Sequence, residues 1–426
     1  MLAIMFVLFA IGVLVEMPIA FALAGSAIGY LAIAGAVPLT VVVQRMAPGL
    51  DSFPLLAIPL FILAGNLINS GGLATRIFDF ATALFGHIRG SLAHVNIAAS
   101  MIFAGMSGVA QADAAGLGTV EIDAMRKRGF DPGFSAAVTA ASAIIGPIIP
   151  PSVIMVIYAV IAQVSVADLF LAGILPGLLI GALLMAQVYW MAVTGRVVAP
   201  VQPRATLPDV GRAFWRALPA LLAPIILVAG LLSGAATPTE LGAVTVIYAA
   251  AVGFAIGELT LRGALKAVTE AGLTAGVLVF IISAAVPFGW VVSVNNVPAQ
   301  FADFMLSLTD NKWLILFVVN LLLLLAGLVM ETTAILLIAV PALLPLAAAL
   351  QIDLVHFGVV MVLNLLIGAT TPPFGVILFI MMDIAKISFG RMVRSMLPFY
   401  VPLGAALLVI TYCPDLVLFL PRLFTN

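Results

Sequence analysis

Apolar runs of helix length follow one another along almost the whole chain, and this pattern limits the fold more than any other feature. The runs recur from Met1 to Phe424, and 8% of the residues are charged. An average soluble domain has about 25% charged residues. A bilayer core of roughly 30 Å needs about 20 apolar residues per helical crossing. The sequence therefore predicts an all-α polytopic membrane protein. Its helices are expected to cross the lipid bilayer and to contact lipid.

Charge, cysteine content and motifs exclude several other classes. The net charge of −1 predicts no nucleic-acid partner, since such binding needs a basic surface. Cys413 is the single cysteine, so no intrachain disulfide or cysteine metal cluster is expected. The first basic residue is Arg45, which makes 2–15 a retained transmembrane helix rather than a cleaved signal peptide. No phosphate-binding loop occurs, and we expect no cofactor.

Two apolar segments, 92–125 and 313–350, are too long for one crossing. Basic residues flank 92–125 at both ends, and cytoplasmic loops collect Lys and Arg, so this segment must enter the membrane and turn back. We predict re-entrant hairpins, with tips at 105–108 and near 327–333, because irregular backbone is tolerated where protein or a cavity surrounds it. The other apolar segments predict ten crossings, near 2–15, 18–36, 54–69, 134–163, 170–194, 217–233, 240–256, 272–292, 358–384 and 396–412.

The basic residues agree with this topology. Arg45, Lys312 and Arg422 then face outside, and the remaining 14 of the 17 basic residues face the cytoplasm. Both termini are expected outside the cytoplasm. Any other parity for the long segments scatters basic loops over both faces.

An internal repeat is visible at an offset of 222 residues. Ile149-Pro150-Pro151 recurs as Thr371-Pro372-Pro373, and Ala104-Gly105 recurs as Ala326-Gly327. Leu175-Pro176 and Asp131 recur at the same offset as Leu397-Pro398 and Asp353. The two hairpins enter from opposite sides, so the pattern predicts inverted repeats, the plan of many secondary transporters. The alternative is an ordinary bundle whose prolines only kink helices.

This plan divides the chain into five parts. Residues 1–53 are expected to form scaffold helices of the first repeat, and 54–195 its transport elements, with the hairpin at 92–125 and a broken helix at 134–163. Residues 196–270 are expected to form a cytoplasmic loop and the scaffold helices of the second repeat. The second set of transport elements is 271–412, with the hairpin at 313–350 and a broken helix at 358–384. Residues 413–426 form a C-terminal tail.

Two proline pairs interrupt the predicted broken helices and suggest ion sites. Each proline lacks an N–H and leaves a carbonyl of the preceding turn without its partner. Freed carbonyls and nearby hydroxyls suit a hard cation such as sodium. The alternative is that the hydroxyls bond back to their own helix. The candidate sodium ligands are Gly105, Ser107, Gly146, Gly327, Thr332, Gly368, Thr370 and Thr371.

The half-helices that follow the breaks predict an anion site. Unpaired N–H groups and the helix dipole attract negative charge at a helix N-terminus. A carboxylate substrate is expected there, close to bound sodium rather than to an arginine. The candidate substrate residues are Ser107, Pro150, Ser152, Glu331 and Pro372.

Carboxylates within apolar segments need separate interpretation because burying their charge is costly. Thr237-Pro238-Thr239-Glu240 has a capping-box pattern, which favours a structural role for Glu240. Asp113 and Glu121 lie on the outgoing arm of the first hairpin. Glu331 at the second tip is a candidate for ion or proton linkage, or else caps a helix start.

Gly105-Met106-Ser107-Gly108 also has the context of a serine nucleophile. That chemistry needs a histidine base within hydrogen-bonding reach. His87 and His94 are expected at the cytoplasmic mouth of the hairpin, and His356 on the opposite face. We therefore expect no enzymatic activity.

Several runs of residues resemble the large permease family of tripartite ATP-independent periplasmic (TRAP) transporters, DctM-like. In the first half these are 103–108, Ala112-Asp113, 116–118, Gly146, 149–152 and Tyr158. In the second half they are 327–331, Pro341, Pro345, Ile352-Asp353, 357–359, Asn364, Ile367-Gly368 and 371–373. Where many relatives have a second serine after Ser107-Gly108, this chain has Val109, which removes one hydroxyl from the first ion site.

The resemblance implies a multi-pass protein of the bacterial inner membrane that works as a sodium-driven elevator. It implies import of a small organic anion, with a periplasmic substrate-binding protein and a small TRAP membrane subunit. The chain begins at its first permease helix, so we expect that subunit to be a separate chain. The alternative is an autonomous sodium-coupled dicarboxylate-type carrier. An ATP-driven importer would need a coupling loop, and the longest loop expected, 196–216, is short and proline-rich.

Overall fold

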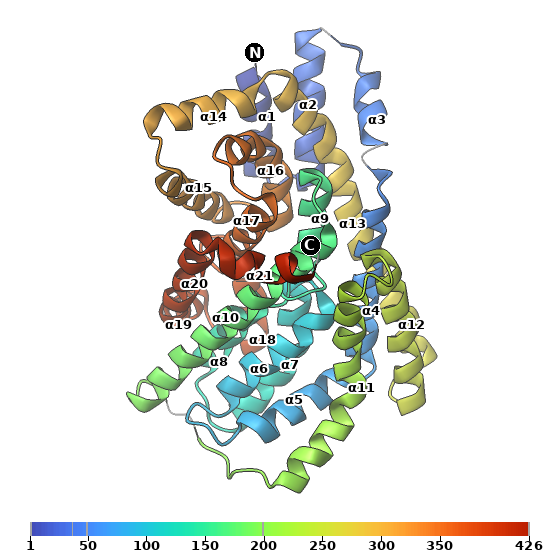
Figure 1. The fold of residues 1–426 in the computed structure, drawn as a ribbon, viewed down its shortest axis with the longest axis vertical. Helices are drawn as coiled ribbons and strands as arrows, with labels where there is room; N and C mark the ends of the chain where they lie inside the picture. Colours follow the sequence, from blue (N-terminus) through green and yellow to red (C-terminus); the bar gives the residue numbers. More distant parts are fainter. Residues whose placement is uncertain (1, 36, 48–49, 198–199, 425–426) are drawn as a thin grey trace.

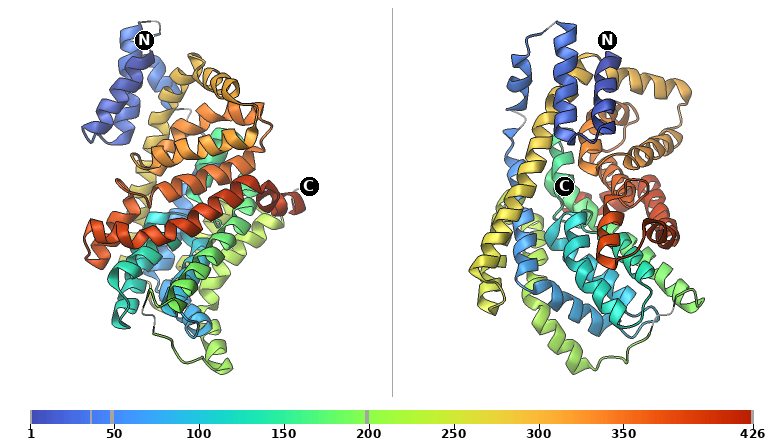
Figure 2. Two further views of the ribbon diagram at one scale, coloured as in Figure 1. Left: turned by 90° about the vertical axis from the view of Figure 1, so that its left-hand side faces the viewer. Right: turned by 180° about the vertical axis from the view of Figure 1, so that it is seen from behind.

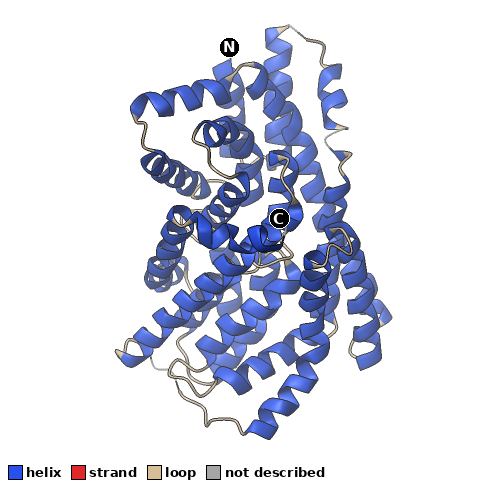
Figure 3. Ribbon diagram, in the orientation of Figure 1, coloured by secondary structure: helices blue, strands red, loops and turns tan. Residues whose placement is uncertain are grey.

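Helices make up the regular structure of the protein. The computed structural model describes residues 2–35, 37–47, 50–197 and 200–424, and no strand occurs within these ranges (Figure 3). The first half contains α1 Leu2–Leu14, α2 Ile19–Ala34, α3 Thr40–Met46, η2 Phe53–Leu56, α4 Ala57–Ser70, α5 Leu73–Phe85, α6 Leu92–Ser107, α7 Ala110–Lys127, α8 Pro132–Ala143, α9 Val153–Ala162 and α10 Val166–Val193. The second half contains α11 Leu207–Leu232, α12 Pro238–Ile256, α13 Leu261–Val294, α14 Val297–Leu308, α15 Lys312–Gly327, α16 Thr332–Ala349, α17 Leu354–Gly368, α18 Val376–Ala385, α19 Phe389–Met396, η3 Leu397–Phe399, α20 Tyr400–Tyr412 and α21 Pro414–Phe424.

Many of these helices are long and apolar enough to cross a bilayer. By length and composition, seven helical stretches qualify among the described residues, including α10, α11, α12 and α13. Seven shorter apolar helices of 10 to 17 residues accompany them in the described part of the chain. They include α6 and α15, which precede the hairpin tips, and three halves of the broken helices, α9, α17 and α18. The protein is therefore a multi-pass membrane protein.

Each long apolar segment is a pair of helices joined by a tight turn. In the first, α6 ends at Ser107 and α7 begins at Ala110, and Gly108 between them has φ +67°, a conformation that favours glycine. The turn lies at 108–109, slightly later than the predicted 105–108, so Gly105 belongs to α6. In the second, α15 ends at Gly327 and α16 begins at Thr332.

The two proline pairs separate helices that lie nearly end to end in the sequence. Residues 144–152 separate α8 from α9, and residues 369–375 separate α17 from α18. The Pro150–Pro151 and Pro372–Pro373 peptide bonds are both cis. The first break places non-helical backbone in the interior of the protein, where residues 144–148 and 150–152 are buried, whereas Pro373 and Phe374 of the second break are exposed.

The second half repeats the element order of the first. The helices α16, α17, α18 and α19 start 222 or 223 residues after α7, α8, α9 and α10. Contacts between the halves are reciprocal: α7 packs on α18, and α16 packs on α9. Reciprocal contacts of this kind are expected when two halves of a chain are related by a pseudo-two-fold axis.

The repeated helices α7 to α10 and α16 to α19 are called the repeat core below. Several helices outside it form a separate layer. The helices α2, α4, α12 and α13 lie along one edge of the molecule, where α13 packs on α2 and α4 and α12 packs on α4 (Figures 1 and 2). Hairpin helices α15 and α16 and the broken helices lie on the other side of α13 (Figure 1).

Some helices begin earlier than the sequence division drawn above. The boundary at 270/271 falls inside α13, which starts at Leu261 behind the N-cap Thr260, whose side chain accepts from the Gly263 N–H. Helix α11 starts at Leu207, so the expected loop to residue 216 is shorter; Thr206 caps it and Pro208 lies in its first turn. The expected C-terminal tail contains α21.

Candidate functional site

The tip of the first hairpin is joined to the first helix break by main-chain atoms. The Gly108 carbonyl accepts a hydrogen bond of 3.2 Å from the Val153 N–H, the first residue of α9. A β-carbon added to Gly108 would lie 2.7 Å from the Pro151 carbonyl oxygen. Only a glycine fits here, both for this approach and for its positive φ.

A buried carboxylate lies at the same junction. Asp113 is 3% exposed, and its Oδ1 accepts a hydrogen bond from the Ser107 hydroxyl. Its other oxygen, Oδ2, is buried without a hydrogen-bond partner. A β-carbon on Gly146 would lie 1.9 Å from that oxygen, so Asp113 reaches the backbone of the break. Ser107 and Asp113 thus bring side-chain oxygens, the kind of ligand that a hard cation prefers, up to the backbone of the break at Gly146.

Ser152 organises the start of α9 rather than facing a cavity. Its side chain accepts from the Met155 N–H at 3.2 Å and donates to the Pro147 carbonyl at 2.5 Å. These bonds satisfy one N–H of the helix start and one carbonyl of the break. Gly105 is also outside the junction, because its Cα packs against Pro224 of α11.

The second tip and the second break meet in the corresponding way. The Leu328 carbonyl accepts a hydrogen bond of 3.3 Å from the Phe374 N–H. Gly327 and Gly368 pack Cα against Cα: a β-carbon on Gly327 would lie 2.9 Å from the Gly368 Cα. Both junctions therefore hold a hairpin tip against a broken helix through backbone.

The threonine hydroxyls of the second junction donate to backbone carbonyls. Thr370 and Thr371 both donate to the Ile367 carbonyl, at 2.8 and 2.7 Å, and Thr332 donates to the Leu365 carbonyl at 3.5 Å. For Thr370 and Thr371 this is the back-bonding to their own helix that the sequence left open as an alternative, whereas Thr332 of α16 donates to α17. A hydroxyl that donates its proton keeps its lone pairs, so these oxygens can still accept or coordinate.

Glu331 caps the start of α16. Its carboxylate accepts from the Thr333 and Ala334 N–H groups at 2.9 and 3.2 Å and from the Thr333 hydroxyl at 3.0 Å. The helix-start cap that the sequence suggested is therefore present, and a role of the same carboxylate in ion or proton linkage stays a prediction. The carboxylate occupies the helix end at which an anion would otherwise bind.

A cavity of about 250 Å³ lies where both tips meet the first break and α13. Glu331 lines it, and so do Gln111 and Thr274, which sequence reasoning did not single out. A single threonine on an apolar helix gives no signal in a sequence. Among the described residues, no Arg or Lys lines this cavity. The lining residues are Gly108, Val109, Ala110, Gln111, Pro147, Val153, Ile154, Ile157, Thr274, Leu278, Glu331, Thr332, Thr333 and Leu366.

A second cavity of about 300 Å³ adjoins the first and lies between the first hairpin, α4 and α13. Ser107 lines it, together with Asn66 and Asn69 of α4. Two asparagines three residues apart share one face of an apolar helix, a signal in the sequence that could have identified them. Pro150, Ser152 and Pro372 line neither cavity.

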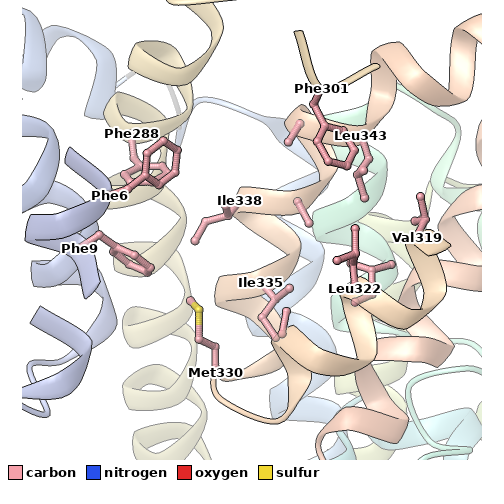
Figure 4. A pocket seen from close by; sticks show the side chains of 14 residues that line it. Phe6, Phe9, Phe288, Phe301, Val319, Leu322, Met330, Ile335, Ile338 and Leu343 are labelled. Atoms are coloured by element: carbon pink, nitrogen blue, oxygen red, sulfur yellow. The ribbon is translucent and has the colours of Figure 1, made fainter. Parts of the chain in front are cut away.

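A third cavity, of about 290 Å³, is lined by apolar side chains only. Phe6, Phe9 and Phe288 of α1 and α13 face Met330 and Ile338 of the second hairpin across it (Figure 4). It offers no polar ligand. It lies between α1 and α13 on one side and the second hairpin on the other, and α13 also packs directly on α16.

Comparisons with known proteins agree with this architecture. Residues 2–416 match the family described as "Tripartite ATP-independent periplasmic transporter, DctM component". The chain is 42% identical over 409 residues to the sialic acid TRAP transporter large permease protein SiaM of Vibrio cholerae, covering 96% of this chain and 95% of that protein. It is 39% identical over 373 residues to the C4-dicarboxylate TRAP transporter large permease protein DctM of Pseudomonas aeruginosa, covering 87% of each.

A solved structure shares the fold. The YdaH transporter of Alcanivorax borkumensis superimposes with a TM-score of 0.60 at 15% identity, covering 88% of each chain. The family match spans nearly the whole chain, and its members are transporter permeases rather than enzymes. With apolar helices that cross the inner membrane, joined hairpin tips and helix breaks, and this match, the chain belongs to the DctM family of TRAP transporter large permeases.

Proposed function

We propose that this permease imports a small organic anion by sodium-coupled elevator transport. The observation that carries the proposal is the convergence of both hairpin tips and the first helix break on one cavity. Transporters of inverted-repeat design bind substrate and coupling ions at such breaks. Among substrates, a sialic acid or a C4-dicarboxylate is favoured, since SiaM and DctM are named for these.

Sodium is proposed to bind at the two junctions. In the first, Ser107, Asp113 and the backbone at Gly146 supply oxygens, and the unpartnered Asp113 Oδ2 supports a cation there. In the second, the ligands are the backbone at Gly327 and Gly368 and the hydroxyls of Thr332, Thr370 and Thr371. Gly105 is a weaker candidate, because it packs on Pro224.

Two carboxylates near the cavity suggest how ion and anion binding are coupled. Glu331 lines the cavity, and Asp113 lies one hydrogen bond from Ser107 at the first tip. The negative charges of these two carboxylates oppose binding of an anionic substrate until bound cations neutralise them, because like charges repel strongly at low dielectric. A substrate carboxylate then meets bound sodium and the N-terminal end of α9. Among the described residues, no Arg or Lys lines the cavity to bind the substrate carboxylate in place of sodium.

Transport itself is proposed to be a sliding of the repeat core against the outer helices. The apolar cavity between α1, α13 and the second hairpin supports this, because an interface without directed polar contacts resists sliding little (Figure 4). A periplasmic binding protein is proposed to deliver the substrate, and a small membrane subunit, as a separate chain, to extend the scaffold.

Uptake into proteoliposomes tests the proposal. The chain is reconstituted with its small subunit, the binding protein is added outside, and uptake of labelled sialic acid and of a labelled C4-dicarboxylate is measured with and without an inward sodium gradient. Uptake that requires both sodium and the binding protein is expected. Sodium-driven uptake without the binding protein would indicate an autonomous carrier, and uptake indifferent to sodium would overturn the ion sites.

A further inference from the structure

Glu121 is the most completely isolated carboxyl group in the first hairpin. It lies on α7 and is fully buried, and no donor meets either of its oxygens with full hydrogen-bond geometry, although the Thr139 side chain lies next to it. An ionised carboxylate buried without a cation or hydrogen-bond donors costs several kcal/mol, and in membrane segments such a group is functional by default. The proposed sodium junction does not use Glu121, so its role needs another explanation.

A row of buried polar side chains lies beside Glu121 inside the same helix bundle. Asn96 donates to the Thr139 hydroxyl at 2.6 Å and accepts from Ser142 at 2.9 Å, and Ser100 donates to Ser142 at 3.0 Å. All four side chains are at most 3% exposed. They come from α6 and α8, the two helices that flank α7 most closely within the first repeat.

Thr139 brings this row to Glu121. A β-carbon on Gly118, one turn before Glu121, would lie 3.0 Å from the Thr139 methyl group, so Thr139 faces α7 at this level. Further along α7, toward the hairpin tip, Asp113 adds a like charge that disfavours a second ionised carboxyl. The bundle thus supplies hydroxyl and amide groups but no cation beside Glu121 in the described part of the chain.

Other titratable groups on the packed elements are engaged elsewhere or exposed. On α6, His94 Nε2 is 2.9 Å from the Arg89 carbonyl oxygen. On α18, Asp383 pairs with Lys386 at 2.7 Å, and on α5, Arg76 pairs with Glu258 at 2.7 Å. Helix α8 itself contributes no titratable side chain. The remaining charged groups on α5 and α7 are Asp79, Asp113, Asp123, Arg126 and Lys127.

We propose that Glu121 is a proton-binding site of the permease, held as a neutral carboxylic acid beside the Thr139–Asn96–Ser142–Ser100 row, and that uptake requires this proton. A neutral acid needs one acceptor for its O–H, and the hydroxyl and amide groups of the row can accept or donate as required. Ionisation would place an uncompensated negative charge inside the hairpin, two turns from Asp113, and loosen the packing of α6, α7 and α8.

Infrared spectroscopy of the reconstituted wild-type protein tests proton binding without any transport. At neutral pH a protonated carboxyl gives a carboxylic-acid C=O stretch that an ionised carboxylate lacks. We expect the Glu121→Gln variant to lose one such band and the Asp123→Asn variant, altered at an exposed position of the same helix, to keep it. An unchanged band in Glu121→Gln would overturn the proposal.

A second variant keeps the test decisive if Glu121→Gln does not yield monodisperse protein. The double variant D113N/E331Q retains Glu121 and removes the other two carboxyls named at the junctions. A carboxylic-acid band that survives in it supports the assignment, and its loss overturns it.

The pH profile of uptake tests the functional part, which rests on the transport function proposed above. With equal pH on both sides of the membrane, wild-type uptake is expected to fall by about tenfold per pH unit once pH exceeds the titration midpoint. Glu121→Gln mimics the neutral form and is expected to stay flat over that range, while Asp123→Asn follows the wild type. The same decline in Glu121→Gln would overturn the role in uptake. Absence of uptake at every pH, with the infrared band present, would count against the transport proposal instead.

Discussion

Gly327 and Gly368 lie Cα against Cα at the second junction, so that a methyl group on Gly368 would sit 2.8 Å from the Gly327 Cα. Interiors are packed too tightly to absorb such a group without displacement. The contact joins the end of α15 to the end of α17, directly beside the second helix break. Small side chains at both positions are therefore a condition for closing the hairpin tip on the break.

The variant Gly368→Ala should separate the second tip from its break. Overpacking costs about 1–3 kcal/mol, and the displaced tip should lower uptake by about tenfold or more. Thermal unfolding in detergent and sodium-driven uptake measure the two effects. Gly404→Ala is the matched control, since a β-carbon there would meet no atom within 4 Å. Equal behaviour of the two variants would contradict the proposed importance of the Gly–Gly contact.

Asp113→Asn should weaken sodium binding at the first junction. The amide keeps the shape of the side chain but removes the negative charge whose Oδ2 lies against Gly146. Loss of about 1.4 kcal/mol or more raises the half-saturating sodium concentration by at least about tenfold. Sodium titration of uptake is the measurement, with Asp123→Asn as the exposed control on the same helix. A sodium dependence like that of the wild type would rule Asp113 out as a ligand.

The ionised Asp131 side chain should stabilise the folded protein, and we expect this contribution to the free energy of unfolding to be lost in acid. This half-exposed residue lies in the loop between α7 and α8. Partial burial raises its pKa, but the Phe134 N–H and the Arg391 guanidinium, at 2.5 Å, outweigh that effect and lower the pKa overall. Because the folded pKa is below the unfolded value of about 3.9, the stabilisation is complete above that value and is lost as pH falls through the folded pKa.

Thermal unfolding of wild type and Asp131→Asn between about pH 6 and about pH 3 measures this contribution. Asparagine remains a good N-cap for α8, so the variant removes the charge and keeps the cap. We expect the wild type to be the more stable at the upper end and the difference to shrink as pH falls toward the lowered pKa of Asp131. A constant difference across the range would mean that the ion pair with Arg391 contributes nothing that depends on ionisation.

Tyr158→Phe should loosen the contact between the two repeats. The Tyr158 hydroxyl donates to the Leu354 carbonyl at 2.7 Å, joining α9 of one repeat to the start of α17 in the other. Removing one such hydrogen bond costs about 1 kcal/mol, with more if the carbonyl stays unpaired. Unfolding in detergent measures the loss, and Tyr189→Phe, at a half-exposed position on α10, provides the comparison. Equal melting of both variants would refute the expected link.

Local features of this fold could be predicted from the sequence. The capping box at Thr237 is confirmed: Glu240 accepts from the Thr237 N–H at 2.7 Å, and Thr237 accepts from the Glu240 N–H at 3.3 Å. Both partners lie within one turn, so the sequence contains the whole interaction. The same kind of signal at Thr206 and Thr260 marks the early starts of α11 and α13, where apolar periodicity alone placed them too late.

Contacts between distant segments could not be predicted in the same way. Gly105 and Gly108 look alike in the sequence, yet one packs on Pro224 and the other on Pro151. Thr274 lines the central cavity only because α13 passes beside both tips. Which glycine, threonine or carboxylate reaches a junction depends on packing between residues more than 30 positions apart, as between Asp113 of α7 and Gly146 in the break before α9, or between Tyr158 and Leu354. Secondary-structure propensity and residue spacing describe local sequence only, so they do not predict contacts between such distant residues.

The hydrogen bonds from Val153 to Gly108 and from Phe374 to Leu328 use only main-chain atoms. Every residue except proline supplies both a main-chain N–H and a carbonyl. Substitution of Val153, which lines the central cavity, by any residue other than proline can therefore change the shape and polarity of the cavity wall while the attachment of tip to break persists. A change in the side chains that line the cavity can thus leave the main-chain attachment of tip to break intact.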